Sequence, residues 1–185
     1  AVLHAKYTGS EEAVIGTPAV GRGHPDLDDT VGMFVNTLAV RVKPEAHLPF
    51  SQFAAHVKAE LLQAYQHGHY PLAKLVEKLN LPFDANRNPL FDTMFVLQEE
   101  PLAVTQMPDL TVEPQLWRNR QAKFDLTWAW QEQGGQLVGE IEYRADMWDK
   151  ESIVRMAQHY VWLLEQIAAH PERTVREFEL ITPEE

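Results

Sequence analysis

Apolar residues occupy nearly every position of residues 31–42, and this pattern predicts a central strand in a sheet that is covered on both faces. Other segments alternate apolar and polar residues over shorter lengths and are bounded by turn-forming residues, as strands usually are. Residues 124–130 and 136–143 are joined by Gly134-Gly135, a strong signal for a hairpin turn. The remaining strands are predicted at residues 13–16, 91–97 and 110–116, with a weakly patterned connection at residues 98–109.

Apolar residues recur at helical spacing in three further segments. Pro71 stands at the favoured first position of the second helix, and Asp149 is a good N-cap for the third. Residues 1–7 are typical of the last turns of an amphipathic helix, which suggests a piece of a longer polypeptide. Together the elements predict an α/β (α+β) fold built as a two-layer sandwich, without fixing the strand order. The three predicted helices span residues 48–66, 71–79 and 149–169.

Charge and composition exclude several classes of function. The chain of 185 residues has 27 acidic and 16 basic residues, and its formal net charge of −11 disfavours nucleic acid and anionic membranes as partners. It has no cysteine, so disulfides and cysteine-rich zinc sites are impossible, and a cytoplasmic location is compatible. No apolar run approaches the roughly 18 residues of a membrane span. His67 and His69 offer two metal ligands where zinc needs three, so no metal site is predicted.

Four short motifs, in order along the chain, resemble those of one family. Residues 32–37, Gly-Met-Phe-Val-Asn-Thr, resemble the Gly-x-Phe-Val-Asn-Thr motif of condensation domains in nonribosomal peptide synthetases. Residues 15–22 are similar to that family's Val-Gly-Thr-Pro-x-x-Gly-Arg, and residues 86–91 to its Ser-Arg-Asn-Pro-Leu-Phe. Residues 67–72 are a degenerate copy of its His-Gln-Asp-x-Pro-Phe. There His69 replaces the aspartate, so any role of that carboxylate is in doubt.

The resemblance implies half of a chloramphenicol-acetyltransferase-like fold, with a mixed β-sheet packed against helices. It also implies one wall of a tunnel in which an aminoacyl or peptidyl thioester on one carrier protein condenses with the amine on another. Residues 17–30, which would otherwise be a surface connector, are then part of the tunnel floor. The residues expected to line the tunnel are Asn36, Gly16, Thr17 and Pro18. The residues expected to be structural or to face phosphopantetheine are Arg41, Arg87 and Asn88.

Two of these residues have a structural and a functional interpretation. Asn36 shares a strand face with Leu38 and Val40, so it is either a hydrogen-bonded anchor in the core or a site residue. Arg87, in a turn, either binds a carboxylate at two points and holds the turn against the sheet, or faces a phosphopantetheine arm. The structural interpretation is favoured for both, because most buried amides satisfy nearby backbone groups and one arginine does not make a phosphate site.

The family's catalytic signature, His-His-x-x-x-Asp-Gly, is missing, because none of the eight histidines has a histidine beside it. Residues 1–181 are therefore predicted to be the C-terminal subdomain of a condensation domain, with residues 182–185 beginning a linker. No catalytic residue is assigned, and the chain alone is predicted to be inactive. It binds no cofactor directly, since phosphopantetheine arrives on partner carrier proteins. The other expected partners are the N-terminal half of the domain, an adjacent adenylation domain and a second copy of the chain.

Two other interpretations remain open. One is a condensation-like domain without catalysis that recruits another protein, such as an oxygenase or a carrier protein. The other is an epimerisation or heterocyclisation domain of the same fold, although the wording of residues 34–37 and 86–90 is closer to a condensing domain.

Overall fold

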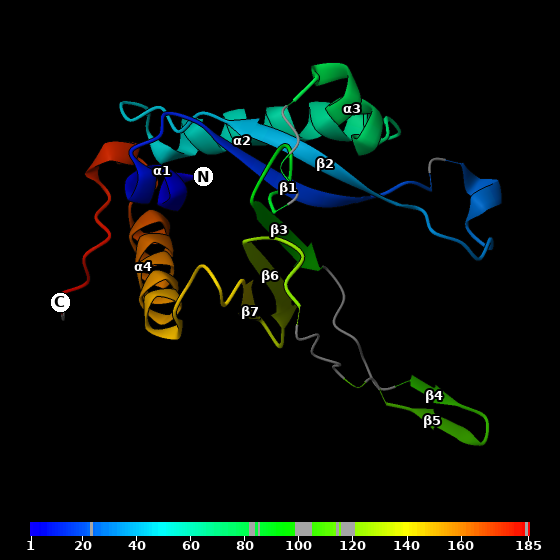
Figure 1. The fold of residues 1–185 in the computed structure, drawn as a ribbon. Coiled ribbons are helices and arrows are strands. Elements are labelled where there is room, and N and C mark those ends of the chain that lie inside the picture. Colours follow the sequence, from blue (N-terminus) through cyan, green and yellow to red (C-terminus); the bar gives the residue numbers. More distant parts are fainter. Residues whose placement is uncertain are drawn as a thin grey trace.

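A mixed five-stranded sheet with helices packed against it forms the body of the protein (Figure 1). The computed structural model describes residues 1–22, 24–81, 84, 86–98, 105–113, 115, 121–183 and 185. The strands of the sheet are β1 (Ala13–Val20), β2 (Val35–Val42), β3 (Thr93–Gln98), β6 (Leu126–Gln133) and β7 (Gln136–Tyr143). The helices are α1 (Val2–Thr8), α2 (Phe50–Gln66), α3 (Leu72–Leu79) and α4 (Lys150–Ala169). Short 3-10 turns occur at Pro25–Leu27 and Val175–Glu177.

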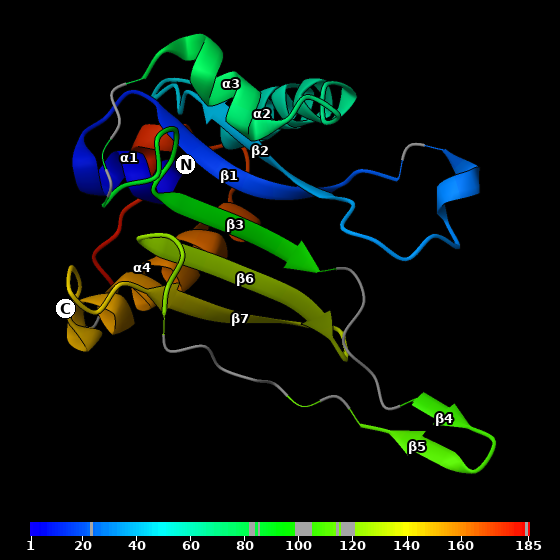
Figure 2. The same ribbon diagram turned by 45° about the vertical axis from the view of Figure 1, so that its right-hand side comes forward.

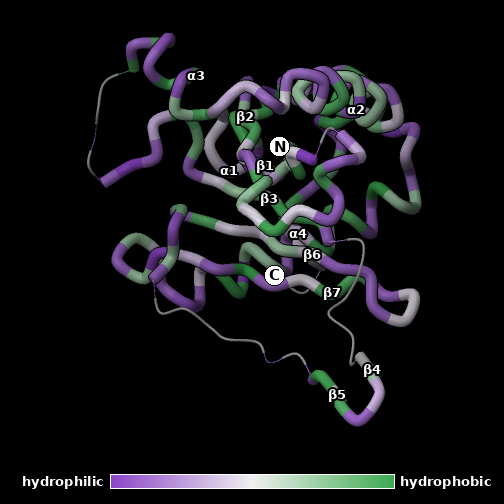
Figure 3. Tube along the Cα trace, turned by 90° about the vertical axis from the view of Figure 1, so that its right-hand side faces the viewer, coloured by the Kyte–Doolittle hydropathy of each residue, from purple (hydrophilic) through white to green (hydrophobic). Residues whose placement is uncertain are grey.

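The strand order is β2-β1-β3-β6-β7, with β3 parallel to both of its neighbours and the outer pairs antiparallel. This confirms the mixed sheet. Two further strands, β4 (Thr105–Met107) and β5 (Leu110–Val112), pair with each other and lie apart from the sheet (Figures 2 and 3). The connection expected at residues 98–109 therefore contains a strand, whereas Leu116 lies outside the described residues.

One hydrophobic core lies between the sheet and the helical layer of α1, α2 and α4. Alternation along β2 directs Leu38, Val40 and Val42 to this core, while Phe53 of α2 and Leu163 of α4 face them from the helices. The predicted two-layer sandwich is thereby confirmed. The other buried members of this core are Val2, Leu3, Ala19, Leu126, Trp128, Ile153, Met156, Val175 and Phe178.

The expectation that residues 31–42 form a central strand is wrong. The strand in this region, β2, is the first in the sheet order and has β1 as its neighbour, so it is an edge strand. Val31 and Met33 are 101% and 90% exposed, so the apolar run before the strand belongs to a loop outside the core. Apolar composition alone did not distinguish a buried strand from an exposed apolar loop, because both are short runs of apolar residues.

The strand predicted at residues 13–16 continues to Val20, where a loop was expected to begin at Thr17. Strand β1 pairs along its whole length with β2, and Pro18 lies opposite Thr37. Its pairing with β3 covers only Ile15 and Gly16, so Pro18 lies beyond the part of β1 that has strands on both sides. Proline is tolerated in strands at such positions, where one side of the backbone lacks a ladder partner.

The predicted hairpin is confirmed, with Gly134 and Gly135 at positive φ (60° and 77°) between β6 and β7. These angles suit glycine, because side chains disfavour the left-handed region. Aromatic side chains of β6 also pack into the core. Trp128 and Trp130 lie 4.8 Å and 5.4 Å, centroid to centroid, from the ring of Tyr160 on α4.

The predicted helices are present with small shifts at their starts. Helix α2 begins at Phe50, and Pro71 is the N-cap of α3 instead of its first helical residue. At α4 the expected N-cap is confirmed, because Asp149 Oδ1 accepts a hydrogen bond of 2.7 Å from the backbone N–H of Ser152.

The N-cap hydrogen bonds of Asp149 should make one contribution to stability that is lost in acid. Hydrogen bonds from the backbone and side chain of Ser152 lower the pKa of Asp149 below its ordinary value. A folded-state pKa below the unfolded one contributes stability above the unfolded pKa, and this contribution is lost as pH falls through the folded value. We expect the urea midpoint of Asp149→Asn to fall less steeply than that of wild type between about pH 6 and about pH 3. Glu151→Gln is the control, and equal slopes for Asp149→Asn and wild type would contradict the prediction.

Candidate functional site

Asn36 connects β2 to the loop between α2 and α3. Its Nδ2 donates hydrogen bonds to the backbone oxygens of Gly68, at 2.7 Å, and Tyr70, at 2.9 Å. These two residues belong to the degenerate motif at residues 67–72, so one half-buried amide holds that loop against the sheet. The contacts are those of an anchor. The expectation that Asn36 lines a tunnel stays a prediction.

We expect Asn36→Ala to lower the free energy of unfolding by about 1–3 kcal/mol, because two backbone acceptors lose their donor. Urea unfolding followed by circular dichroism measures this. Asn88→Ala is the matched control, since the Asn88 side chain makes no hydrogen bond to any described residue. A change below about 0.5 kcal/mol for Asn36→Ala would show that water replaces the amide without cost.

Gly16 is buried beneath the ring of Phe91. A Cβ atom built on Gly16 would lie 2.5 Å from Cζ and 2.6 Å from Cδ2 of that ring. The Phe91 ring is itself fixed by stacking on Phe124, with centroids 5.5 Å apart and planes at 30°. Two motif segments distant in sequence therefore meet in one contact. Thr17 and Pro18 are half-buried in β1, and their role as tunnel floor stays a prediction.

Arg87 forms a two-point ion pair with Asp92, just before β3. Its Nε and Nη2 lie 2.8 Å and 2.5 Å from the two carboxylate oxygens. The hydrogen bonds that Arg87 donates to this carboxylate raise the pKa of Arg87. Such a pair holds the turn at residues 86–89 against the sheet, as the structural interpretation requires. Arg41 is exposed on β2 and has no ion pair with a described residue. A contact of either cation with phosphopantetheine stays a prediction.

Arg144 joins three segments and was not singled out from the sequence. Its Nη1 donates to the backbone oxygen of Asn86 at 2.7 Å and lies 3.4 Å from Asp125 Oδ1. Its Nε and Nη2 contact both carboxylate oxygens of Asp146, at 3.1 Å and 2.6 Å. The sequence signal is an arginine two residues before an aspartate at the end of a strand, but its two other partners are 19 and 58 residues away.

These two arginine–aspartate pairs frame an open pocket of about 710 Å³ beside the starts of β3 and β6. Lys123, in its wall, is exposed and has no ion pair with a described residue, so its ammonium is available to a ligand. The amides of Asn88 and Gln121 offer further donors and acceptors. The pocket can hold a polar or anionic group, whereas the arginines are already committed to carboxylates.

The loop between β1 and β2 is folded around Arg22. The Arg22 guanidinium donates to the backbone oxygens of Leu27 and Asp28 and lies 4.4 Å from the ring centroid of Phe34. One side chain thus connects the middle of the loop to its end. The loop carries the exposed Val31 and Met33 outward from the body, where they offer an apolar contact surface.

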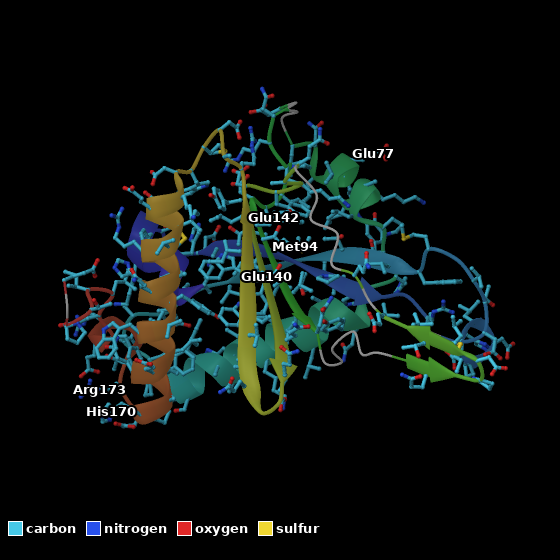
Figure 4. The ribbon with its side chains drawn as sticks, turned by 90° about the horizontal axis from the view of Figure 1, so that it is seen from below. Glu77, Met94, Glu140, Glu142, His170 and Arg173 are labelled. Atoms are coloured by element: carbon cyan, nitrogen blue, oxygen red, sulfur yellow. The ribbon has the colours of Figure 1, made fainter. Side chains whose placement is uncertain are left out.

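The second face of the sheet is polar at its β7 edge. Ile141 lies opposite Trp128 on the core side, so Glu140 and Glu142 project from the other face. Figure 4 shows these two glutamates on β7 and Met94 on the neighbouring part of the sheet. Met94 and Glu142 both lie opposite Thr127, and Met94 is buried, so the charged side chains are at the β7 edge.

Within the part of the chain that the structure describes, no three His, Asp or Glu side chains are grouped as metal ligands. None of the described helices is both long and apolar enough to cross a bilayer.

Comparison with known proteins gives consistent matches. The family model described as "Condensation domain" matches residues 1–185. The chain is 40% identical over 186 residues to tyrocidine synthase 3 of Brevibacillus parabrevis and 38% identical over 183 residues to surfactin synthase subunit 1 of Bacillus subtilis (strain 168). The alignments cover 100% and 99% of this chain but only 3% and 5% of those relatives.

Solved structures match as well. Holo-AB3403, a four-domain nonribosomal peptide synthetase bound to AMP and glycine, superposes with a TM-score of 0.90 at 27% identity, over 98% of this chain and 15% of that one. The X-domain from teicoplanin biosynthesis gives 0.85 at 27% identity, over 97% of this chain and 42% of that one. The starter condensation domain of rhizomide synthetase, at 17% identity and a TM-score of 0.76, shares the fold.

Proposed function

Because this chain belongs to the condensation-domain family of nonribosomal peptide synthetases, we propose that it forms one wall of a condensation tunnel. In that tunnel an aminoacyl or peptidyl thioester on one carrier protein would be joined to the amine on another. The amine attacks the thioester carbonyl, the amide bond forms, and the phosphopantetheine thiol leaves with a proton. The wall holds the two arms in register and excludes water, which is a catalytic contribution through orientation.

The proposal rests on one observation. The family model matches the whole chain, and yet the chain lacks the family's histidine motif. Nearly all of this chain covers 42% of the solved X-domain, as expected for one of two subdomains. The reaction needs a group that moves a proton from the amine or stabilises the transition state, and an imidazole does this near neutral pH. No His-His-x-x-x-Asp-Gly occurs among the eight histidines. The imidazole therefore comes from a complementary half, and the chain alone is inactive.

The residues of this half then have distinct tasks. Asn36 fixes the loop that follows α2, and Gly16 leaves room for the Phe91 ring, which stacks on Phe124. Thr17 and Pro18 supply tunnel floor. Arg87 is committed to Asp92, which supports its structural task over a pantetheine contact. Carrier proteins deliver the thioesters, and an adenylation domain is the expected neighbour in the polypeptide.

A chimera tests the proposal. The C-terminal half of an active condensation domain is replaced by this chain, and dipeptide formation between two loaded carrier proteins is followed by mass spectrometry. We expect product from the chimera, and none when the motif histidine of the first half is changed to alanine or when this chain is assayed alone. A folded but inactive chimera, or product from the chain alone, would contradict the proposal. In the chimera, Asn36→Ala that loses activity without losing stability would assign Asn36 to the tunnel.

A second candidate is a recruitment module without catalysis. The X-domain that was solved in complex with OxyB from teicoplanin biosynthesis superposes on this chain with a TM-score of 0.84 at 26% identity. If this chain also recruits a protein without catalysis, the chimera forms no dipeptide. The immobilised chimera should instead retain the recruited protein. The two candidates thus predict opposite results in the same preparation.

A further inference from the structure

Among the described residues, His159 is the one polar or charged residue that is buried, with 9% of its surface exposed. It lies on α4, and both ring nitrogens have partners. Nδ1 is 2.6 Å from the hydroxyl of Tyr7 on α1, and Nε2 is 2.9 Å from Oε2 of Glu185. The Tyr7 ring also lies 5.8 Å, centroid to centroid, from the imidazole. One buried side chain therefore contacts residues from the two opposite ends of the sequence.

The residues after α4 are held against the helices by several contacts. The Phe178 side chain is buried, and the amide of Gln166 makes two hydrogen bonds with the backbone of Glu179, at 2.7 Å and 3.1 Å. Glu185 also accepts a hydrogen bond of 3.1 Å from the backbone N–H of Thr182. From α1, Lys6 Nζ lies 3.3 Å from the backbone oxygen of Arg176. The last residues are thus packed against both α1 and α4.

We propose that Tyr7, His159 and Glu185 form a hydrogen-bonded relay that couples the position of α1 to the docking of residues 179–183 and of Glu185. This inference does not depend on the proposed function. It assigns to His159 a positioning task between two segments, beyond that of a core histidine whose hydrogen bonds are satisfied.

The chemistry of the three groups links the two contacts of the imidazole. An ionised glutamate only accepts hydrogen bonds, so Nε2 carries a proton and donates to Glu185. The Tyr7 hydroxyl is the partner of the other nitrogen, as donor to a neutral ring or as acceptor from a protonated one. Without this hydroxyl, nothing on α1 holds the imidazole in its orientation, and the bond to Glu185 weakens. A change at Tyr7 is thus transmitted to a carboxylate 178 residues further along the chain.

Hydrogen exchange of the backbone amides, read by mass spectrometry on the 185-residue chain, tests the relay. Tyr7→Phe is expected to speed exchange in residues 179–183 by about fivefold to tenfold, and tenfold corresponds to about 1.4 kcal/mol. Glu185→Gln is expected to speed exchange in the last turn of α1. In a His159→Leu background both effects disappear, because the residue that joins the two segments is gone. His159→Gln restores part of the coupling, since an amide can donate to the carboxylate.

A matched control lies at the C-terminal end of the same helix. His170, just after α4, pairs with Glu172 at 3.3 Å, and both side chains are largely exposed. Figure 4 shows His170 at this end of α4, beside Arg173. His170→Gln is expected to leave exchange in α1 and in residues 179–183 unchanged. Unchanged exchange in residues 179–183 after Tyr7→Phe, or a Tyr7→Phe effect of equal size with and without His159, would overturn the relay.

The pH dependence of hydrogen exchange in residues 179–183 distinguishes the relay from simple packing. The groups that face His159 are Tyr7 from α1 and Glu185 from the C-terminal segment, and Arg155 of α4 acts on both. Hydrogen bonds from Thr182 and His159 lower the pKa of Glu185, so the contact should persist below the ordinary pKa of a glutamate and be lost only in more acidic solution. Glu185→Gln should abolish this acid transition in residues 179–183. An identical transition in wild type and Glu185→Gln would assign the docking to packing alone.

Discussion

Replacing Phe178 by alanine is expected to lower the free energy of unfolding by about 3–5 kcal/mol. Phe178 is 1% exposed, the most deeply buried large side chain among the described residues, and its ring meets that of Phe50 edge-to-face with centroids 6.1 Å apart. The neighbouring backbone is fixed by the capping interactions of Thr174 and Glu177, so the surroundings cannot collapse into the space. Such rigid surroundings place the loss toward the upper part of the range.

Urea unfolding monitored by tryptophan fluorescence measures the loss, and Ile181→Ala serves as the control. Ile181 lies in the same segment but is 69% exposed, so its truncation should change stability by less than about 0.5 kcal/mol. If Phe178→Ala is as mild as Ile181→Ala, the segment after α4 contributes little to the fold, and the docking described for residues 179–183 loses its support.

Gly16→Val is expected to destabilise the protein by about 1–3 kcal/mol, although strand propensity alone predicts a gain. Valine is favoured over glycine in strands, and Gly16 lies within β1. Its Cβ, however, would enter the space of the Phe91 ring, which is only 3% exposed and stacked on Phe124. The two effects have opposite signs, so the sign of the change decides between packing and propensity.

One control isolates the contact. In a Phe91→Leu background the smaller side chain leaves room, and Gly16→Val should then cost much less than in wild type, a non-additivity expected for residues in contact. A Gly16→Val protein as stable as wild type would mean that Phe91 moves aside at no cost.

The elements that were predicted correctly depend on local signals. The β6–β7 hairpin follows from Gly134 and Gly135, and the start of α4 from Asp149, each acting within a few residues. Strand β2 was predicted to be central but lies at the edge of the sheet, and an edge strand differs from a central one only in lacking a second neighbour. That property depends on the whole strand order, which periodicity along one segment does not contain.

The candidate site shows the same division. The two-point contact of Arg87 was one of two interpretations, and its partner Asp92 is five residues away. The hairpin register, with Leu126 opposite Tyr143, brings Asp125 beside Arg144, but Asn86 reaches Arg144 only through the parallel pairing of β3 with β6. Arg144 was missed because this second contact depends on the strand order. For Asn36 the sequence indicated an anchor but gave no acceptor, since backbone oxygens such as that of Gly68 have no sequence signature.

The strand order also determines how the sheet can be assembled. The antiparallel pairs β1–β2 and β6–β7 join consecutive strands and can form early, since a hairpin closes in about 1–10 μs. Strand β3 must then enter between them, and both of its parallel pairings require long loops to close, which is slow. Until it does, β1 and β6 each have an unpaired edge that another chain can occupy. We therefore expect the yield of refolded monomer to fall as protein concentration rises during refolding. Dilution should restore the yield of monomer. The insertion of β3 between β1 and β6 is then the step at which correct folding competes with aggregation.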